Sequence, residues 1–267
     1  MPTEVVVLEG ARTPFGTFGG VLKDVTPTDL AVIAAKEALR RSGVEPAMID
    51  NVFLGLVIPW GGAGAYFARH AALKAGVPEC VPALTLNRLC GSGLQAVVSA
   101  AQALLTGDAT FALAGGAENM SLAPFVVKGA RWGVGLGEGK LDDVLWDTLT
   151  DAYNNTPMAI TAENLAERYA ITRQEQDEFA YRSQMACKQA IERGLLREEI
   201  APVPVKERHG NVVRMERDEH PRPAVTMQDL ERLKARFKEG GTVTPGNASG
   251  INDGAAALVL TTAENAR

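Results

Sequence analysis

Residues 3–118 alternate between short runs of β-branched residues and segments with helical periodicity, and this alternation limits the possible fold more than any other feature. The segments expected as strands are TEVVVLEG, IDNVFLGLVI, VPALTLNRL and ATFALAGGAE. Helices are expected between them in TPTDLAVIAAKEALRRSG, AYFARHAALKAG and GSGLQAVVSAAQALLTG. Such a β-α-β-α-β-α-β series is typical of an α/β domain with parallel strands.

The alternation stops at about residue 119 and returns only near the end of the chain. A helix is predicted in TRQEQDEFAYRSQMACKQAIERGLL, with Thr172 and Glu175 as its capping box and Gly194 at its end. A hairpin is expected in the proline-broken segment that follows, and strand character returns at 255–260. We therefore predict one α/β domain, residues 1–118 and 246–267, with a loop domain inserted at 119–245.

Composition excludes several classes of protein. The chain is 46% hydrophobic and 22% charged, as soluble globular proteins are, and its net charge of −5 argues against nucleic-acid binding. Three cysteines at irregular spacing fit neither a disulfide framework nor a metal site. No apolar run long enough for a membrane span and no signal peptide are evident, so we expect a cytoplasmic protein without a membrane partner.

Cys90 is the candidate nucleophile. It lies between a predicted strand and a predicted helix, directly before Gly91 and Gly93. The positive end of a helix stabilises a thiolate, and nearby glycines leave backbone N–H groups open to a substrate oxygen. The alternative is a small buried side chain at a tight turn, which is the usual role of a cysteine outside a disulfide.

The same stretch, GSGLQA, also matches the G-x-G-x-x-A pattern of a dinucleotide-binding turn, which would make the chain a Rossmann-type oxidoreductase. Against this reading, the pattern follows the third strand of the series rather than the first. Glu118 also lies farther along the chain than the acidic residue that binds the ribose in such proteins.

Four motifs occur in one order over nearly the whole chain: NRLCGSGLQAV, GGAENMS, TAENLAERY and GTVTPGNASGINDGAAALVL. Together they resemble the thiolase family, and ARTPFGTFGGVLKDVTPTDL is most similar to its 3-ketoacyl-CoA thiolase (acetyl-CoA acyltransferase) branch. The resemblance implies a layered αβαβα fold of two similar halves, the first carrying an inserted loop domain, and assembly as homodimers or tetramers. Ketosynthases share this fold, but the long insertion favours a thiolase.

The resemblance also implies the activity. Cys90 would accept the acyl group of a 3-ketoacyl-CoA, release acetyl-CoA and pass the acyl group to a second coenzyme A, or run the reverse condensation. Coenzyme A and acyl-CoA would be substrates, with no permanently bound cofactor.

Coenzyme A contacts carry over by position in the motifs. Arg222 and Val225 in HPRPAV, Phe237 in ARFKEGGT and Ser249 in GNASG match such positions. A guanidinium suits the nucleotide phosphates, an aromatic ring the pantetheine arm and a hydroxyl its amides. Residues 206–238 carry nine Lys or Arg against six Asp or Glu, which supplies a local basic patch.

The family's Gly-His-Pro and Cys-x-Gly motifs do not occur in these 267 residues. We read His70, His209 and His220 as structural or surface residues, and Cys80 and Cys187 as packing residues. The chain is therefore expected to be the nucleophile-bearing portion of a thiolase, incomplete alone, with a separate C-terminal thiolase half as a candidate partner. A CoA-binding or assembly module without turnover is the alternative.

Overall fold

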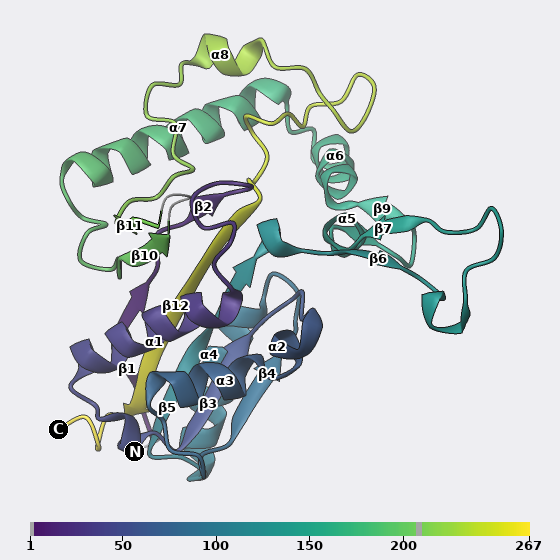
Figure 1. The fold of residues 1–267 in the computed structure, drawn as a ribbon. Coiled ribbons are helices and arrows are strands. Elements are labelled where there is room, and N and C mark those ends of the chain that lie inside the picture. Colours follow the sequence, from purple (N-terminus) through teal and green to yellow (C-terminus); the bar gives the residue numbers. More distant parts are fainter. Residues whose placement is uncertain (1–2, 207–209) are drawn as a thin grey trace. The chain divides into compact units, whose positions relative to one another are not determined.

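The computed structural model describes residues 3–206 and 210–267, which form two compact units. Unit 1 contains Met1–Leu122, Arg197–Glu219 and Asn252–Arg267, and unit 2 contains Ala123–Leu196 and His220–Ile251. The units differ from the predicted insertion at 119–245, because Arg197–Glu219 returns to unit 1 in the middle of the excursion. Figure 1 shows the elements of both units.

A mixed sheet forms the centre of unit 1. Its strands, in spatial order, are β1 (Val5–Arg12), β12 (Asn252–Thr262), β5 (Phe111–Asn119), β3 (Asn51–Gly55) and β4 (Ala83–Leu86), and the short β2 (Gly16–Thr17) also pairs with β12. Strand β3 runs parallel to β4 and β5, as predicted. Strand β12 is antiparallel to both β1 and β5 and separates them (Figure 1), which the series along the chain did not predict.

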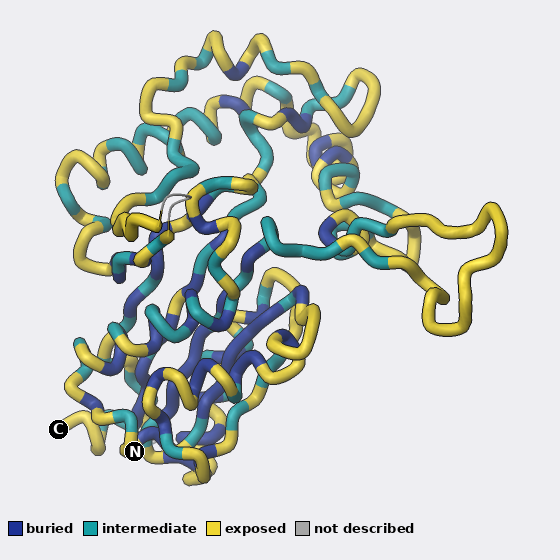
Figure 2. The backbone as a smooth tube through the Cα atoms, in the orientation of Figure 1, coloured by how far each residue is buried: buried dark blue, intermediate teal, exposed yellow. Residues whose placement is uncertain are grey.

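Helices cover both faces of this sheet. Helices α1 (Pro27–Ser42) and α3 (Phe67–Ala75) pack on one face, where Val52, Leu54 and Leu113 point. Helix α4 (Ser92–Thr106) packs on the other face, against Phe53 and the alanines of β5. This is the α-β-α arrangement that period-2 strands and amphipathic helices predict, and the strands are its most buried part (Figure 2). Two short helices, η1 (Pro46–Met48) and α2 (Gly61–Ala65), complete the series.

Local signals in the sequence set the helix ends. The Thr26 hydroxyl accepts a hydrogen bond from the Asp29 N–H group, Pro27 takes the first turn of α1, and Gly43 ends it with φ 70°. The stretch Leu89–Thr106, which contains α4, is long and apolar enough to cross a membrane by length and composition, contrary to our expectation for the sequence. Its buried side chains nevertheless pack against the sheet, so we interpret it as a core helix of this fold.

The returning segment 197–219 is held to the start of the chain by a largely buried ion pair. It contains the predicted hairpin, β10 (Val203–Lys206) with β11 (Val212–Met215). The Arg12 guanidinium donates to both carboxylate oxygens of Asp218, at 2.7 and 2.9 Å, and its Nε donates to Glu199 at 2.8 Å. Asp218 also accepts from the Phe15 N–H group at 2.8 Å. This one carboxylate therefore joins residues 12–15 to the returning segment.

Unit 2 is built from helices and short ribbons. Its helices are α5 (Val144–Thr148), α6 (Met158–Arg168), α7 (Arg173–Glu192) and α8 (Met227–Glu231), and its ribbons pair β6 (Phe125–Val127) with β7 (Leu141–Asp143) and β8 (Thr150–Asp151) with β9 (Thr156–Pro157). Helices η2 (Met120–Leu122) in unit 1 and η3 (Ala130–Trp132) in unit 2 are single 3₁₀ turns. The predicted capping box of Thr172 and Glu175 is confirmed at the start of α7.

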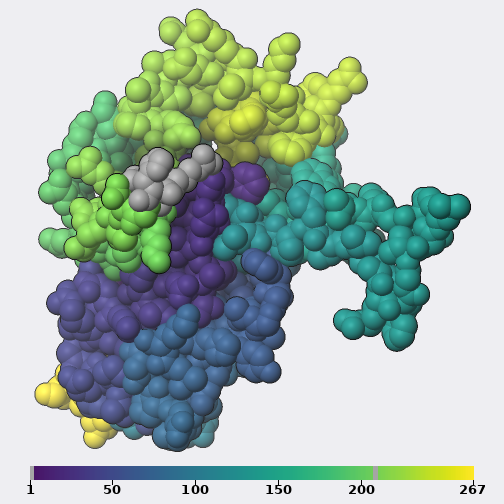
Figure 3. Space-filling model, in the orientation of Figure 1, coloured from purple at the N-terminus to yellow at the C-terminus, as the bar shows by residue number. Residues whose placement is uncertain are grey.

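The β6–β7 ribbon extends into an exposed arm. Every residue from 127 to 141 is exposed, including Trp132 and Leu136, and the arm stands out as a narrow projection in Figure 3.

Replacing Asp218 by Ala should lower the free energy of unfolding by about 3 kcal/mol, because it leaves the largely buried Arg12 guanidinium and the Phe15 N–H group without this carboxylate. Arg40→Ala is the matched control, since its ion pair with Glu37 is exposed and contributes little to stability. Urea unfolding of both variants checks the difference. Equal losses in the two variants would contradict this account of the Arg12–Asp218 pair.

Candidate active site

The segment that carries Cys90 lies at the carboxyl edge of three parallel strands. Cys90 follows β4, the turn at Val57 and Ile58 follows β3, and Glu118 is near the end of β5. Ligands of α/β proteins commonly bind at this edge, because loops there present side chains and helix N-termini together. The structure therefore places the predicted nucleophile, which is exposed, at a position that suits catalysis.

A strained turn presents Cys90. Leu89 has φ 49°, a left-handed conformation that a branched side chain seldom adopts. The Ser92 hydroxyl stabilises this turn from within, donating to the Leu89 carbonyl at 2.6 Å and accepting from the Arg88 N–H group at 2.9 Å. Strain of this kind costs on the order of 1–3 kcal/mol and is typical of functional turns.

Close packing of α4 on β3 requires glycine at position 55. A Cβ atom there would lie 2.7 Å from the Cβ of Ser92 and 2.9 Å from its carbonyl carbon. Gly55 thus lets the first turn of α4 sit directly against the strand, where any larger residue would displace the Cys90 turn.

The start of α4 leaves backbone donors beside the thiol. Gly91 is the N-cap residue and makes no side-chain capping bond. Within the described residues, the Gly93 and Leu94 N–H groups form no hydrogen bond outside the helix, and a Cβ at Gly93 would meet nothing within 4 Å. Open N–H groups at a helix start can stabilise a thiolate or the oxyanion of an attacked carbonyl.

Sequence reasoning missed two polar residues of this edge. One oxygen of Glu118 accepts from the Val57 and Ile58 N–H groups at 2.9 and 3.3 Å. Its other oxygen is buried and has no hydrogen-bond partner within residues 3–206 and 210–267. Burial raises the pKa of Glu118, against the opposing effect of the Val57, Ile58 and Asn119 N–H groups. The second residue is Asn87, whose side-chain amide donates to the carbonyl of Val57, the residue that also donates to Glu118, at 3.1 Å. A polar residue closing the buried run ALAGGAE was the available signal.

The four predicted coenzyme A contacts all lie in unit 2. Arg222, Phe237 and Ser249 are exposed and Val225 is half-buried. The Arg222 N–H group donates to Gln184 on α7, and its guanidinium donates to the His220 carbonyl. Phe237 is 41% exposed, so its ring is not part of the core. Their roles stay predictions.

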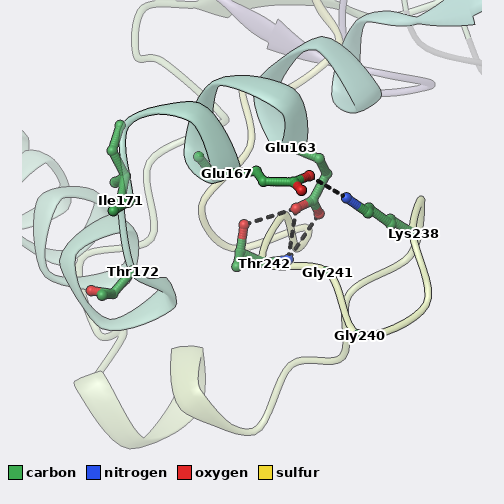
Figure 4. A pocket seen from close by; sticks show the side chains of 10 residues that line it. Glu163, Glu167, Ile171, Thr172, Lys238, Gly240, Gly241 and Thr242 are labelled. Atoms are coloured by element: carbon green, nitrogen blue, oxygen red, sulfur yellow. Dashed lines mark hydrogen bonds and ion pairs between the residues drawn. The ribbon is translucent and has the colours of Figure 1, made fainter.

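A shallow cavity of about 440 Å³ lies within unit 2, between α6 and the segment 238–242 (Figure 4). Glu163 anchors it, accepting from the N–H groups of Thr242 and Val243 and from the Thr242 hydroxyl. Burial alone would raise the pKa of Glu163, but these donors hold it below its ordinary value. Neither Cys90 nor any predicted coenzyme A contact lines this cavity.

The remaining histidines and cysteines show no catalytic arrangement in the described residues. His70 is exposed on α3 and stacks on Tyr66, His220 is half-buried, and His209 lies outside the described residues. Cys187 is half-buried in α7, but Cys80 is exposed, so its prediction as a packing residue is wrong. No group of three or more His, Cys, Asp or Glu residues is placed to hold a metal ion in the described part of the chain.

The dinucleotide reading of GSGLQA disagrees with the sheet. In the Rossmann arrangement the glycine-rich turn follows a strand at the point where the strand order reverses, inside the sheet. Here the turn follows β4, which is the last strand at one edge.

Comparison with known proteins identifies the family. The family model described as thiolase, N-terminal domain, matches residues 5–264. The chain is 48% identical, over 96% of its length and 64% of the relative, to the mitochondrial 3-ketoacyl-CoA thiolase of Bos taurus. It is 47% identical, over 100% of its length and 67% of the relative, to an acetyl-CoA acetyltransferase of Syntrophomonas wolfei. The chain thus spans about two thirds of the length of these curated relatives.

Solved structures agree. Human mitochondrial 3-ketoacyl-CoA thiolase in complex with CoA superimposes with a TM-score of 0.94 at 45% identity, over 98% of this chain and 65% of that one. The acetyl-CoA acetyltransferase of Bacillus anthracis gives 0.95 at 46% identity, over 99% of this chain and 66% of that one. These matches confirm the predicted thiolase-like α/β fold.

The predicted cytoplasmic location is wrong as an inference from the sequence. Relatives from Bos taurus, Homo sapiens and Mus musculus, at 46–48% identity, are named mitochondrial. The absence of a recognisable leader in MPTEVVVLEGARTP therefore does not decide the compartment.

Cys90 should react faster than Cys80 with limiting iodoacetamide at neutral pH, although both thiols are exposed, because only Cys90 lies at the open start of a long helix. Peptide mapping of the folded protein measures both labels. Ser92→Ala, which removes the hydroxyl that fastens the turn, should reduce the advantage of Cys90. Equal or faster labelling of Cys80 in the wild-type protein would rule out this assignment.

Proposed function

The chain belongs to the thiolase family, and on that premise we propose that it takes part in acyl transfer to and from coenzyme A through a thioester on Cys90. The observation that carries the proposal is the position of an exposed Cys90 on a strained turn, with open N–H groups at the start of α4 beside it. The substrates are 3-ketoacyl-CoA and coenzyme A in the cleavage direction, or acetyl-CoA in condensation. Coenzyme A is a substrate here rather than a resident cofactor.

The cleavage consists of a carbon–carbon bond cleavage that forms a thioester on Cys90, followed by one thioester exchange with coenzyme A. The Cys90 sulfur attacks the 3-keto carbon, and the bond between C2 and C3 breaks with its electron pair passing to C2. C2 takes up a proton and leaves as acetyl-CoA, while the acyl group stays on Cys90. The thiol of a second coenzyme A then attacks this thioester, loses its proton and releases the Cys90 thiolate. No oxidation or reduction occurs, and the covalent intermediate divides one difficult step into two.

Residues of unit 1 supply the nucleophile and its setting. The Leu89 turn, fastened by Ser92, aims the sulfur, and the N–H groups of Gly93 and Leu94 are suited to an oxyanion. Proton transfer at C2 and at the incoming thiol needs acid–base groups. The Gly-His-Pro and Cys-x-Gly motifs implied by the resemblance are not in these 267 residues, so complete turnover is proposed only for a protein that also contains them.

Residues of unit 2 are proposed to bind coenzyme A. Arg222 would contact the nucleotide phosphates, Val225 and Phe237 the apolar parts of the ligand, and Ser249 an amide of the pantetheine arm. Their exposure in the structure supports this proposal, since each side chain has surface to offer a ligand. We also propose self-association as a dimer or tetramer, for which the exposed Trp132 and Leu136 offer apolar surface.

Incubation with acetyl-CoA should add one acetyl group to the protein, located on Cys90 by peptide mass spectrometry. The reason is that the Cys90 thiolate can exchange directly with the thioester without the proton transfer at carbon that cleavage requires. Cys90→Ala should take up no acetyl group, and Cys80→Ala, which removes the other exposed thiol, should acetylate as the wild type does. Binding of coenzyme A without acetylation of Cys90 would instead support a binding module without turnover.

Arg222→Ala should weaken coenzyme A binding about tenfold at low salt, the loss typical of one charge-assisted hydrogen bond. The loss should shrink as salt is added, because ions screen the contact between arginine and phosphate. Calorimetric titration across a salt series provides the measurement. Arg232→Ala removes the same charge from another exposed position of unit 2 and should change the dissociation constant little. An unchanged dissociation constant for Arg222→Ala would reject this contact.

A further inference from the structure

Glu118, which is half-buried, is a carboxyl group of unit 1 that the proposed chemistry leaves without a role. Its Oε1 atom is buried and has no hydrogen-bond partner among the residues that the structure describes, although a buried oxygen of this kind costs about 1–3 kcal/mol. Its Oε2 atom accepts from two successive N–H groups, those of Val57 and Ile58. An unpaired carboxylate oxygen lowers the stability of the sheet, so packing alone does not explain a glutamate at position 118.

The hydrogen bonds of Glu118 lead to the turn that carries the thiol. Val57, which donates to Glu118, accepts at its carbonyl from the Asn87 side-chain amide at 3.1 Å. The side-chain oxygen of Asn87 in turn accepts from the Leu89 N–H group at 2.9 Å. Leu89 is the left-handed residue directly before Cys90. Three contacts in series therefore join the end of β5, the turn after β3 and the turn after β4.

The geometry gives this chain a mechanical role. The Leu89 conformation is strained and persists only if its surroundings fix it from several sides. Ser92, in the first turn of α4, holds the Leu89 carbonyl. Asn87 accepts from the Leu89 N–H group and is itself bonded to Val57, which follows β3. Asn87 is exposed, so its orientation depends on the Val57 carbonyl, and Glu118 fixes that peptide by its N–H groups.

We propose that Glu118 is a positioning residue for Cys90, which acts through the Val57–Ile58 turn and Asn87 to hold the Leu89 turn and thereby keep the sulfur at the open start of α4. The role in acyl transfer rests on the proposed function, whereas the role in thiol reactivity does not. Glu118 touches neither the sulfur nor a substrate in this role.

Glu118→Ala tests the proposal in the full chain. Alkylation of Cys90 by iodoacetamide should slow about threefold, as expected when an anion loses its place at the first turn of a helix. Acetyl transfer from acetyl-CoA should slow further, by about a hundredfold, because it needs a defined approach to the carbonyl. Alkylation of Cys80 in the same sample should stay unchanged. Glu118→Gln keeps one acceptor oxygen for the two N–H groups and should restore the wild-type rates.

Asp50 provides a matched control. Its carboxylate accepts from the Thr110 and Phe111 N–H groups, at 2.7 and 3.2 Å, and so makes the same pair of contacts at the other end of β5. Asp50→Ala should leave the alkylation rate of Cys90 unchanged. An equal slowing in Asp50→Ala and Glu118→Ala would show a general loosening of the sheet and overturn the proposal.

Asn87→Ala removes the second and third contacts of the series and keeps the Glu118 carboxyl group. It should slow Cys90 alkylation as Glu118→Ala does, and the double variant should be no slower than the slower single one, because contacts in series are lost together. If Glu118→Ala does not fold, Asn87→Ala decides alone, and wild-type alkylation of Cys90 in that variant overturns the proposal. If the wild-type protein is alkylated at Cys90 but takes up no acetyl group, the proposed function is rejected. The positioning role of Glu118 is then decided by the alkylation rates of the variants alone.

Discussion

The pairing of β12 with both β1 and β5 is the constraint on which the rest of the structure depends. Its first residues pair with the last residues of β5, Asp253 with Asn119, so the points where the chain leaves and re-enters the sheet are neighbours. The buried Asp253 carboxylate secures this junction by accepting from the N–H group and the hydroxyl of Ser121. A long excursion can therefore be accommodated without a gap in the sheet.

The active-site edge depends on the same ladder. Pairing with β12 fixes β5, β5 fixes β3, and β3 fixes β4, so the three strand ends that carry Glu118, the Val57 turn and Cys90 keep one relative register. Gly55 then allows α4 to approach closely enough for its first turn to present the thiol. The candidate site thus rests on strands and a helix, and Leu89 supplies its strained backbone position.

Local signals predicted much of this arrangement. The strand and helix periods gave the elements of residues 3–118, and the Thr172 capping box gave the start of α7. The antiparallel place of β12 was not predictable, because periodicity records which face of a strand is buried but not its neighbours. Glu118 and Asn87 were missed because side-chain bonds to distant backbone leave no spacing pattern. The coenzyme A contacts could be predicted only from the resemblance to a family, because exposed side chains show no hydrophobic periodicity from which their role could be inferred.

The central position of β12 also bears on how the sheet forms. Its partners lie far away in the chain, Val5 opposite Thr262 and Phe111 opposite Thr261, so a large loop must close before either ladder exists. During synthesis β1 and β5 emerge long before the strand that joins them. Until then each presents an unpaired edge, the kind of surface that recruits strands from other chains. Strand β12, which is made after both of its partners, is thus the strand that covers these two edges.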